Sequence, residues 1–296
     1  MTAGDELLDL ASAAGARTIF FVGTGRNVGK TTSLRATYLA ACRRGVRGAL
    51  AAIGRDNDGA ELAPAQRKPR IFVRAGTVFA TARGLLARSP ASEILALSRL
   101  QGASGPLLYA RAMEEGSCDL AGPATASGVR EVVAELQEWS DLVIVDGAVD
   151  RIAAVADSQG VIVIACGAAT AHTPQEAIDD VTALVARLRV ERYDPAKPAL
   201  QLEGALTASR AAELVARRET RQIVVGDPTQ IALSGKAARR ALERLDLRCL
   251  RPLRPVAVTV SSIGPERSFE PRAFVRDVAA ATGLPAFDLY AGERAA

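Results

Sequence analysis

The sequence predicts an α/β fold: a mostly parallel sheet flanked by helices on both faces, with an α/β extension in its C-terminal part. Apolar segments with strand character alternate with segments of helical pattern, which is typical of βαβ units. Several apolar segments are hydrophobic on both faces, as strands buried between two helix layers must be. The chain has 296 residues, 49% of them hydrophobic and 24% charged, so one large domain or two smaller ones are expected.

The predicted elements follow in order along the chain. Apolar runs predict strands at 18–23, 48–54, 70–73, 106–112, 141–148, 160–167, 199–206, 221–227 and 255–262. Helical spacing of apolar residues predicts helices at 29–44, 125–139, 174–189, 208–218 and 271–281. The helix from 174 has the best-marked start, because Thr173 is a capping residue, Pro174 suits the first helical position and Glu176 stands three residues after the cap.

Two polar segments suggest domain boundaries. The segment 194–198 contains two prolines and is typical of a turn or linker. It separates an N-terminal domain over 1–193 from a C-terminal α/β region over 199–296, which either continues the same sheet or forms a small second lobe. A looser boundary lies in the polar stretch 54–69.

Charge and cysteine content argue against several classes of protein. The net charge is only +4 and basic residues are interleaved with acidic ones, so we do not expect nucleic-acid binding. No window approaches about 18 consecutive apolar residues, and residues 1–15 are acidic where a secretory leader is basic, so we expect a cytoplasmic protein without a membrane segment. The cysteines form no C-x-x-C pair and should be reduced core thiols: Cys42, Cys118, Cys166 and Cys249.

A glycine-rich loop, residues 23–32, joins the first predicted strand to the helix that follows it. Backbone N–H groups of such a loop can surround phosphate oxygens, and the helix N-terminus adds partial positive charge. Lys30 would reach the β and γ phosphates, and the Thr31 hydroxyl would bind Mg²⁺. The strict pattern G-x-x-x-x-G-K-[ST] fails at one position, where Thr24 replaces the first glycine. The predicted nucleotide-binding residues are Gly23, Thr24, Gly25, Arg26, Asn27, Val28, Gly29, Lys30, Thr31 and Thr32.

Amino-acid usage singles out Lys30. The chain has 58 alanines and 33 arginines but only 4 lysines, a skew that we attribute to the base composition of the coding DNA. A lysine at position 30 fits a phosphate site, since a compact ammonium can reach two phosphates at once and a planar guanidinium would not replace it.

A P-loop NTPase also needs an acidic residue at the end of a later strand. The apolar run 142–145 ends at Asp146, which we expect to hold Mg²⁺ or its water shell. The loop 54–59 offers Asp56 or Asp58 to complete the metal site or to position the attacking water. The predicted catalytic residues are Lys30, Asp146 and Asp56, and the predicted metal ligands are Thr31, Asp146 and Asp56.

Two further strand ends are expected at the ligand-binding edge of the sheet. One is 166–173, which contains His172, the only histidine of the chain; a structural role and a catalytic role are both open for it. The other is 204–209, placed where many P-loop proteins contact the base. Ala208 stands there instead of the lysine of a guanine-specific [NT]-K-x-D motif, which does not favour GTP.

The loop GTGRNVGKTT and the VDGA strand end together resemble the SIMIBI branch of P-loop NTPases that includes dethiobiotin synthetase. This resemblance covers roughly residues 1–170 and implies ATP and Mg²⁺ bound by Lys30, Thr31, Asp146 and an acid of the 56–58 loop. Over the whole chain, the pattern is more similar to the P-loop subunit of the reactivating factor for cobalamin-dependent lysine 5,6-aminomutase. The segments that carry this similarity are AAIGRDNDG, KPRIFVRAGTVFATA, DLAGPATASGVREVV, VIVDGAVDR, IVVGDPTQIAL and AVTVSSIGPERSFEPRAFV.

Three functions follow from these patterns. The reactivating-factor resemblance implies an ATPase that expels damaged cobalamin from a stalled mutase. Its protein partner would be a second subunit of the factor or the client enzyme. This accessory role is the preferred interpretation. The alternative is an ATP-dependent ligase of the dethiobiotin synthetase type, acting on a small carboxylated substrate. A nucleotide-binding module without turnover is the third, since no catalytic base can be named. A homodimer is left open.

Overall fold

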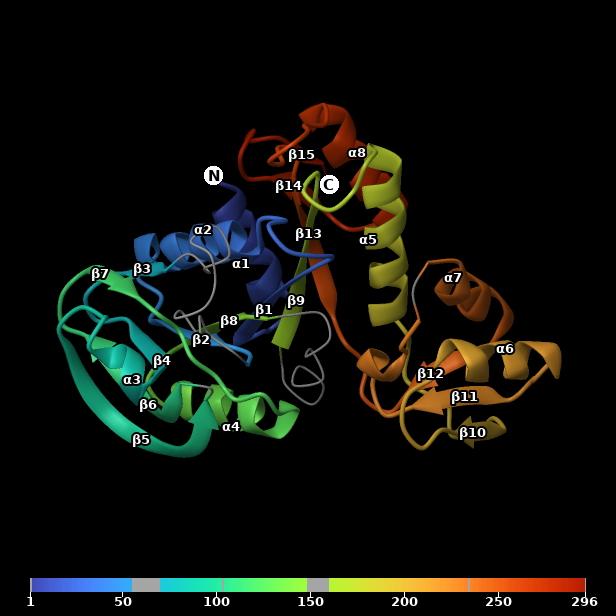
Figure 1. The fold of residues 1–296 in the computed structure, drawn as a ribbon, viewed down its shortest axis with the longest axis horizontal. Coiled ribbons are helices and arrows are strands. Elements are labelled where there is room, and N and C mark those ends of the chain that lie inside the picture. Colours follow the sequence, from blue (N-terminus) through green and yellow to red (C-terminus); the bar gives the residue numbers. More distant parts are fainter. Residues whose placement is uncertain (1, 55–69, 103, 148–159, 234, 296) are drawn as a thin grey trace. The chain divides into compact units, whose positions relative to one another are not determined.

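The computed structural model describes residues 2–54, 70–102, 104–147, 160–233 and 235–295. It is an α/β structure with a large, mostly parallel central sheet flanked by helices (Figure 1). The chain divides into two compact units, which are described separately: Met1–Val22 with Gly29–Val163, and Gly23–Val28 with Ile164–Ala296. Within the described ranges, no helix is long and apolar enough to cross a membrane.

The strands of the first unit form one side of the large sheet. They lie side by side in the order β9-β1-β8-β2-β4-β6-β5, where β9 (Gly160–Gly167) contributes its first half to this unit. The other strands are β1 (Thr18–Gly23), β2 (Gly48–Ala52), β4 (Val78–Ala82), β5 (Ser92–Gly102), β6 (Gly105–Ala112) and β8 (Leu142–Asp146). Strands β1, β8, β2 and β4 are parallel, whereas β6 and β5 form an antiparallel hairpin at the edge. The short strands β3 (Ile71–Val73) and β7 (Gly116–Cys118) pair separately.

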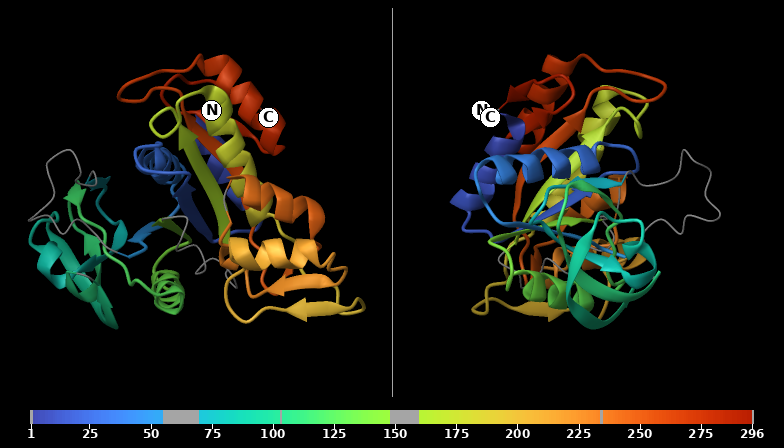
Figure 2. Two further views of the ribbon diagram at one scale, coloured as in Figure 1. Left: turned by 45° about the vertical axis from the view of Figure 1, so that its right-hand side comes forward. Right: turned by 90° about the vertical axis from the view of Figure 1, so that its left-hand side faces the viewer.

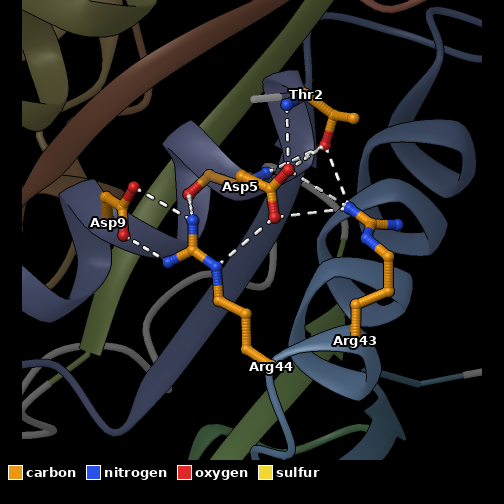
Figure 3. Close-up of polar contacts among 5 residues, drawn as sticks. All are labelled: Thr2, Asp5, Asp9, Arg43 and Arg44. Carbon is orange, nitrogen blue, oxygen red and sulfur yellow. Dashed lines mark hydrogen bonds and ion pairs between the residues drawn. The ribbon is translucent and has the colours of Figure 1, made fainter.

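The helices of the first unit include α1, which the sequence analysis did not predict. They are α1 (Ala3–Ala13), α2 (Lys30–Arg43), α3 (Arg83–Leu86) and α4 (Ala126–Leu136). Helix α1 lies against α2 so closely that a Cβ on Gly4 would be 2.3 Å from the Ala36 carbonyl oxygen. Ion pairs join the same two helices: Asp5 contacts Arg43 (3.3 Å) and Arg44 (3.4 Å) (Figure 3). The acidic side chains that argued against a secretory leader therefore fix α1 to α2.

The second unit continues the large sheet with strands of its own. Its order is β15-β14-β13-β9, built from β13 (Pro255–Ser261), β14 (Ala286–Asp288), β15 (Arg294–Ala295) and the second half of β9. Strands β13 and β14 are parallel, and β15 is antiparallel to β14. Helices α5 (Pro174–Leu188) and α8 (Pro271–Thr282) lie side by side next to these strands (Figure 1).

A three-stranded parallel sheet, β10-β11-β12, is the other part of the second unit. Its strands are β10 (Ala199–Gln201), β11 (Gln222–Val225) and β12 (Leu247–Cys249). Helices α6 (Ala208–Ala216) and α7 (Gly235–Arg244) lie over one face (Figure 2), and the 3-10 helix η3 (Pro228–Gln230) follows β11. This sheet has its own hydrophobic core, which includes Leu206, Ile223 and Ile231. The predicted linker 194–198 thus leads into a small sheet, but the chain returns to the large sheet at β13, and the division into compact units does not follow the linker.

Every predicted strand range overlaps an observed strand, and every predicted helix range overlaps an observed helix. The capped start of α5 is confirmed: Thr173 Oγ1 accepts a hydrogen bond from the Glu176 N–H (3.1 Å). The Glu176 carboxylate accepts from the His172 N–H (2.7 Å), one residue before the cap. The predicted strand at 199–206 is too long, because Gly204 has a φ of +86° and turns the chain away.

Candidate functional site

The glycine-rich loop ends in a backbone conformation suited to surrounding an anion. Gly29 has a φ of +91° and is the N-cap of α2, and Asn27 has a φ of +59°. Left-handed residues alternating with ordinary ones turn successive N–H groups toward one point. Asparagine tolerates this conformation better than most side chains, and glycine adopts it freely. Helix α2 then begins directly, with Ser33 N–H and Oγ both donating to the Gly29 carbonyl oxygen (2.9 and 3.0 Å).

The N-terminus of α2 differs from those of five other helices whose caps the structure describes. A side chain caps α1, α4, α5, α6 and α8, and the capping residues are Thr2, Thr125, Thr173, Thr207 and Glu270. The cap of α2 is a glycine with no side-chain hydrogen bond, and the first turn contains no acidic residue. The partial positive charge at this helix end is therefore not balanced by a carboxylate of its own first turn, which favours an external anion.

Asp146 lies beside the end of β1, in the first unit. Strands β1 and β8 are parallel neighbours in which Phe21 is opposite Asp146, and the Gly147 N–H donates to the Phe21 carbonyl oxygen (2.9 Å). On the other side, β2 pairs in the same register, with Ala52 opposite Asp146. The predicted acid is thus held at the carboxyl end of the strand next to the one that enters the loop, and it is buried. Helix α2, whose first residues are Lys30 and Thr31, also packs against β8.

The first part of the loop, Gly23–Val28, belongs by packing to the second unit. The Thr24 N–H donates to the Ala165 carbonyl oxygen of β9 (2.9 Å). A Cβ on Gly25 would lie 2.5 Å from Cγ2 of Thr170, so a larger residue at this position would force the Thr170 side chain to shift. The φ angle of Thr24 is not positive. A threonine is therefore tolerated at this position, where the strict pattern has glycine.

The remaining predicted ligands lie in part outside the described residues. Asp56 and Asp58 fall in the undescribed stretch 55–69, so the structure does not test their assignment. Among the residues that are described, no group of three or more His, Cys, Asp or Glu could hold a metal ion. Mg²⁺ commonly binds one or two carboxylates, a hydroxyl, waters and substrate phosphates, and a cluster of protein ligands is not required. Thr31 in the first turn of α2 and Asp146 at the end of β8 are a hydroxyl and a carboxylate of the kinds that Mg²⁺ binds.

Of the two additional strand ends, only 166–173 belongs to the large sheet. Residues 166–173 do follow a strand of the large sheet, and there His172 Nδ1 lies 3.1 Å from a guanidinium nitrogen of Arg267. The Arg267 side chain also donates to the Ala171 carbonyl oxygen (3.0 Å), so His172 is part of a polar contact between two loops. The segment 204–209 lies in the three-stranded sheet instead, so Ala208 says nothing about the base.

The loop after β13, and not 204–209, lies beside the end of β9, and the sequence analysis did not predict this. A Cβ on Gly167 would be 2.6 Å from the Ser261 carbonyl oxygen, and a Cβ on Gly264 would be 2.9 Å from the Ala168 carbonyl carbon. The ends of β9 and β13 therefore lie in direct contact within the second unit. Glycines at both positions were the available signal, since close backbone approach requires them.

The cysteines are free thiols, as predicted. Cys118, Cys166 and Cys249 are buried, whereas Cys42 is partly exposed. Burial raises the pKa of the Cys118 thiol to about 12 and that of Cys249 to about 11, with burial the largest cause for both. These thiols stay protonated near neutral pH and are unsuited to nucleophilic catalysis.

No family model, curated protein or solved structure matches the chain.

Proposed function

We propose that the protein is a P-loop ATPase that binds Mg-ATP at the glycine-rich loop. The observation that carries the proposal is the left-handed Gly29 at the start of α2, followed directly by Lys30, with Asp146 ending the strand beside β1. A glycine turn before a helix is common, but the acid at the end of the neighbouring parallel strand is a second and independent requirement of phosphate chemistry. The described residues include both the glycine turn before α2 and the acid at the end of the neighbouring strand.

Each residue has a distinct role in this proposal. Backbone N–H groups of the loop surround the phosphate oxygens, and the Lys30 ammonium binds the β and γ phosphates. The Thr31 hydroxyl and the Asp146 carboxylate hold Mg²⁺ or its waters. When bound, Mg²⁺ bridges phosphate oxygens and neutralises the charge that develops on transfer.

We also propose that ATP turnover serves a partner protein, as the resemblance to a reactivating factor implies. The three-stranded sheet and its core give the chain a folded part beyond the strands that carry the loop, which supports an accessory role. The ligase alternative needs basic side chains to hold a carboxylated substrate. Two candidates in the first unit already face a protein carboxylate: Arg70 Nε and Arg88 Nε lie 3.7 and 3.4 Å from Asp119 Oδ2.

The test compares two lysine variants by calorimetric titration with Mg-ATP and with Mg-GTP. Lys30→Ala should abolish binding, because alanine cannot supply the charge at the phosphates. Lys197→Ala is the matched control, since Lys197 is 62% exposed and pairs only weakly with Asp194 at 3.8 Å. It should bind as the wild type does. Equal affinity of the two variants would overturn the assignment of the loop.

A turnover assay separates the accessory role from the ligase. ATP hydrolysis by the wild-type protein is measured alone, with a cobalamin-dependent aminomutase inactivated by damaged cofactor, and with small diamino or carboxylated substrates. The accessory role predicts recovery of mutase activity that requires ATP and is lost with Lys30→Ala. A phosphorylated small-molecule product without any partner would instead establish the ligase.

A further inference from the structure

A side chain from outside the glycine-rich loop packs directly on Gly25. Thr170 lies in the loop that follows β9, within the second unit. A Cβ added to Gly25 would be 2.5 Å from Cγ2 of Thr170, 3.3 Å from its Cβ and 3.7 Å from its Oγ1. The φ angle of Gly25 is not positive, so the backbone would accept an ordinary residue there. The space beside Gly25 is therefore limited by Thr170, and most closely by its methyl group.

The loop that carries Thr170 is anchored on both sides of this residue. Before it, the Ala168 N–H donates to the Ser261 carbonyl oxygen (3.0 Å). After it, the Ala171 carbonyl oxygen accepts a hydrogen bond from the Arg267 guanidinium (3.0 Å). Threonine is branched at Cβ and has few favourable χ1 rotamers. A stiff side chain on an anchored loop keeps the methyl group in place against Gly25.

Thr170 itself is exposed, so its contact with Gly25 is not part of the hydrophobic core. Its hydroxyl donates a long hydrogen bond to the Gly167 carbonyl oxygen (3.5 Å). Substitutions of exposed side chains usually change the free energy of unfolding very little. A glycine-rich loop, in contrast, loses much conformational freedom when it becomes ordered, and a contact that orders it beforehand lowers the cost of binding a ligand. The Thr170 methyl group is placed to act on the order of the loop more than on the stability of the fold.

We propose that Thr170 is a positioning residue for the glycine-rich loop. Its methyl group holds Gly25, and with it the N–H groups that follow in the loop, in the conformation that receives the phosphates of ATP. The inference rests on the proposed function and adds to its site a residue that the P-loop pattern does not include. Thr170 acts through Gly25 and does not touch the nucleotide.

Calorimetric titration with Mg-ATP and thermal denaturation without nucleotide test this role. Thr170→Ser removes the methyl group and keeps the hydroxyl; its dissociation constant should rise at least about threefold, while its melting temperature stays that of the wild type. Thr170→Val keeps the methyl group and loses the hydroxyl, and it should bind Mg-ATP as the wild type does. Thr220→Ser is the matched control, because Thr220 is also an exposed threonine of the second unit, and its affinity should not change. If the valine variant loses affinity and the serine variant keeps it, the hydroxyl acts on the ligand and the proposal is overturned.

Exchanging the methyl group between the two positions tests the contact itself. Gly25→Ala places a Cβ against Cγ2 of Thr170 and should raise the dissociation constant about tenfold or more. In the double variant Gly25→Ala with Thr170→Ser, the colliding methyl group is absent and the Cβ of residue 170, at 3.3 Å, is the nearest carbon that remains. The double variant should therefore bind at least about threefold more tightly than Gly25→Ala alone. Additive losses in the two single variants would show that the residues act separately and would overturn the proposal.

These results separate the positioning role from the proposed function. A wild type without affinity for Mg-ATP, or equal affinity in Lys30→Ala, overturns the proposed function and this inference with it. A wild type that binds through Lys30 while Thr170→Ser keeps its affinity overturns the positioning role alone. So does a Thr170→Ser variant in which affinity and melting temperature fall in parallel, because that result assigns Thr170 to the stability of the fold.

Discussion

Replacing Gly29 by alanine tests the backbone geometry on which the proposed nucleotide site depends. With a φ of +91°, Gly29 adopts a conformation that costs an ordinary L-residue about 1–2 kcal/mol. If the free variant relieves this strain by rotating φ to a negative value, binding must restore the original loop and repay the same free energy. The dissociation constant for Mg-ATP should therefore rise about 5- to 30-fold.

The control for this experiment lies at the other end of the same helix. Gly45 follows α2 with a φ of +69°, and an added Cβ would meet no atom within 4 Å. Gly45→Ala therefore carries the same kind of backbone strain and should lower the free energy of unfolding by a similar amount, about 1–2 kcal/mol. Its affinity for Mg-ATP should not change.

Calorimetric titration gives the affinities, and thermal denaturation without nucleotide gives the stabilities. The geometric argument requires that Gly29→Ala weaken binding and that Gly45→Ala leave it intact. If both variants bind as the wild type does, the loop does not present its N–H groups to phosphate. If both lose affinity equally, the effect comes from general destabilisation of α2.

Three further predictions concern single residues. Asp146→Asn should retain most nucleotide affinity without metal but lose the gain that Mg²⁺ confers, because a neutral amide is a poor Mg²⁺ ligand; titrations with and without Mg²⁺ measure this. Thr173→Ala should lower the free energy of unfolding by about 1 kcal/mol in denaturant titration, since the cap on the Glu176 N–H is lost. Cys118, whose pKa is raised to about 12 mainly by burial, stays protonated at pH 8 and should resist alkylation in the native protein, while the partly exposed Cys42 reacts; mass spectrometry of the labelled protein distinguishes them.

Local patterns predicted the elements of the fold better than their arrangement. Strands such as β1, β8 and β9 are buried at every position, so their apolar runs were long and unmistakable. Strand β5 escaped prediction because its apolar residues lie at an exposed edge and alternate irregularly across a bulge. Helix α1 escaped prediction because it buries only Gly4, Leu7, Leu8 and Ala11, so its apolar face is short.

The order of strands in a sheet is a long-range property that short segments do not encode. The runs at 199–206 and 255–262 have similar apolar character, yet only the second joins the large sheet. Both are followed by a polar loop, so the position expected for base contacts was assigned to the earlier one. The close packing of Gly167 on Ser261 and of Gly264 on Ala168 brings the ends of β9 and β13 together, and it is visible only once the strands are placed.

Three positions of the glycine-rich loop, 24, 25 and 29, have different physical requirements here. Gly29 is needed for its positive φ, and Gly25 for the space beside Thr170. Position 24 has neither requirement, because its N–H bonds to Ala165 and its backbone is not left-handed, so a threonine fits. A departure from the pattern at this position therefore leaves the backbone conformation of the loop intact, whereas the same substitution at position 29 would not. By this reasoning Thr24→Gly should leave Mg-ATP affinity unchanged.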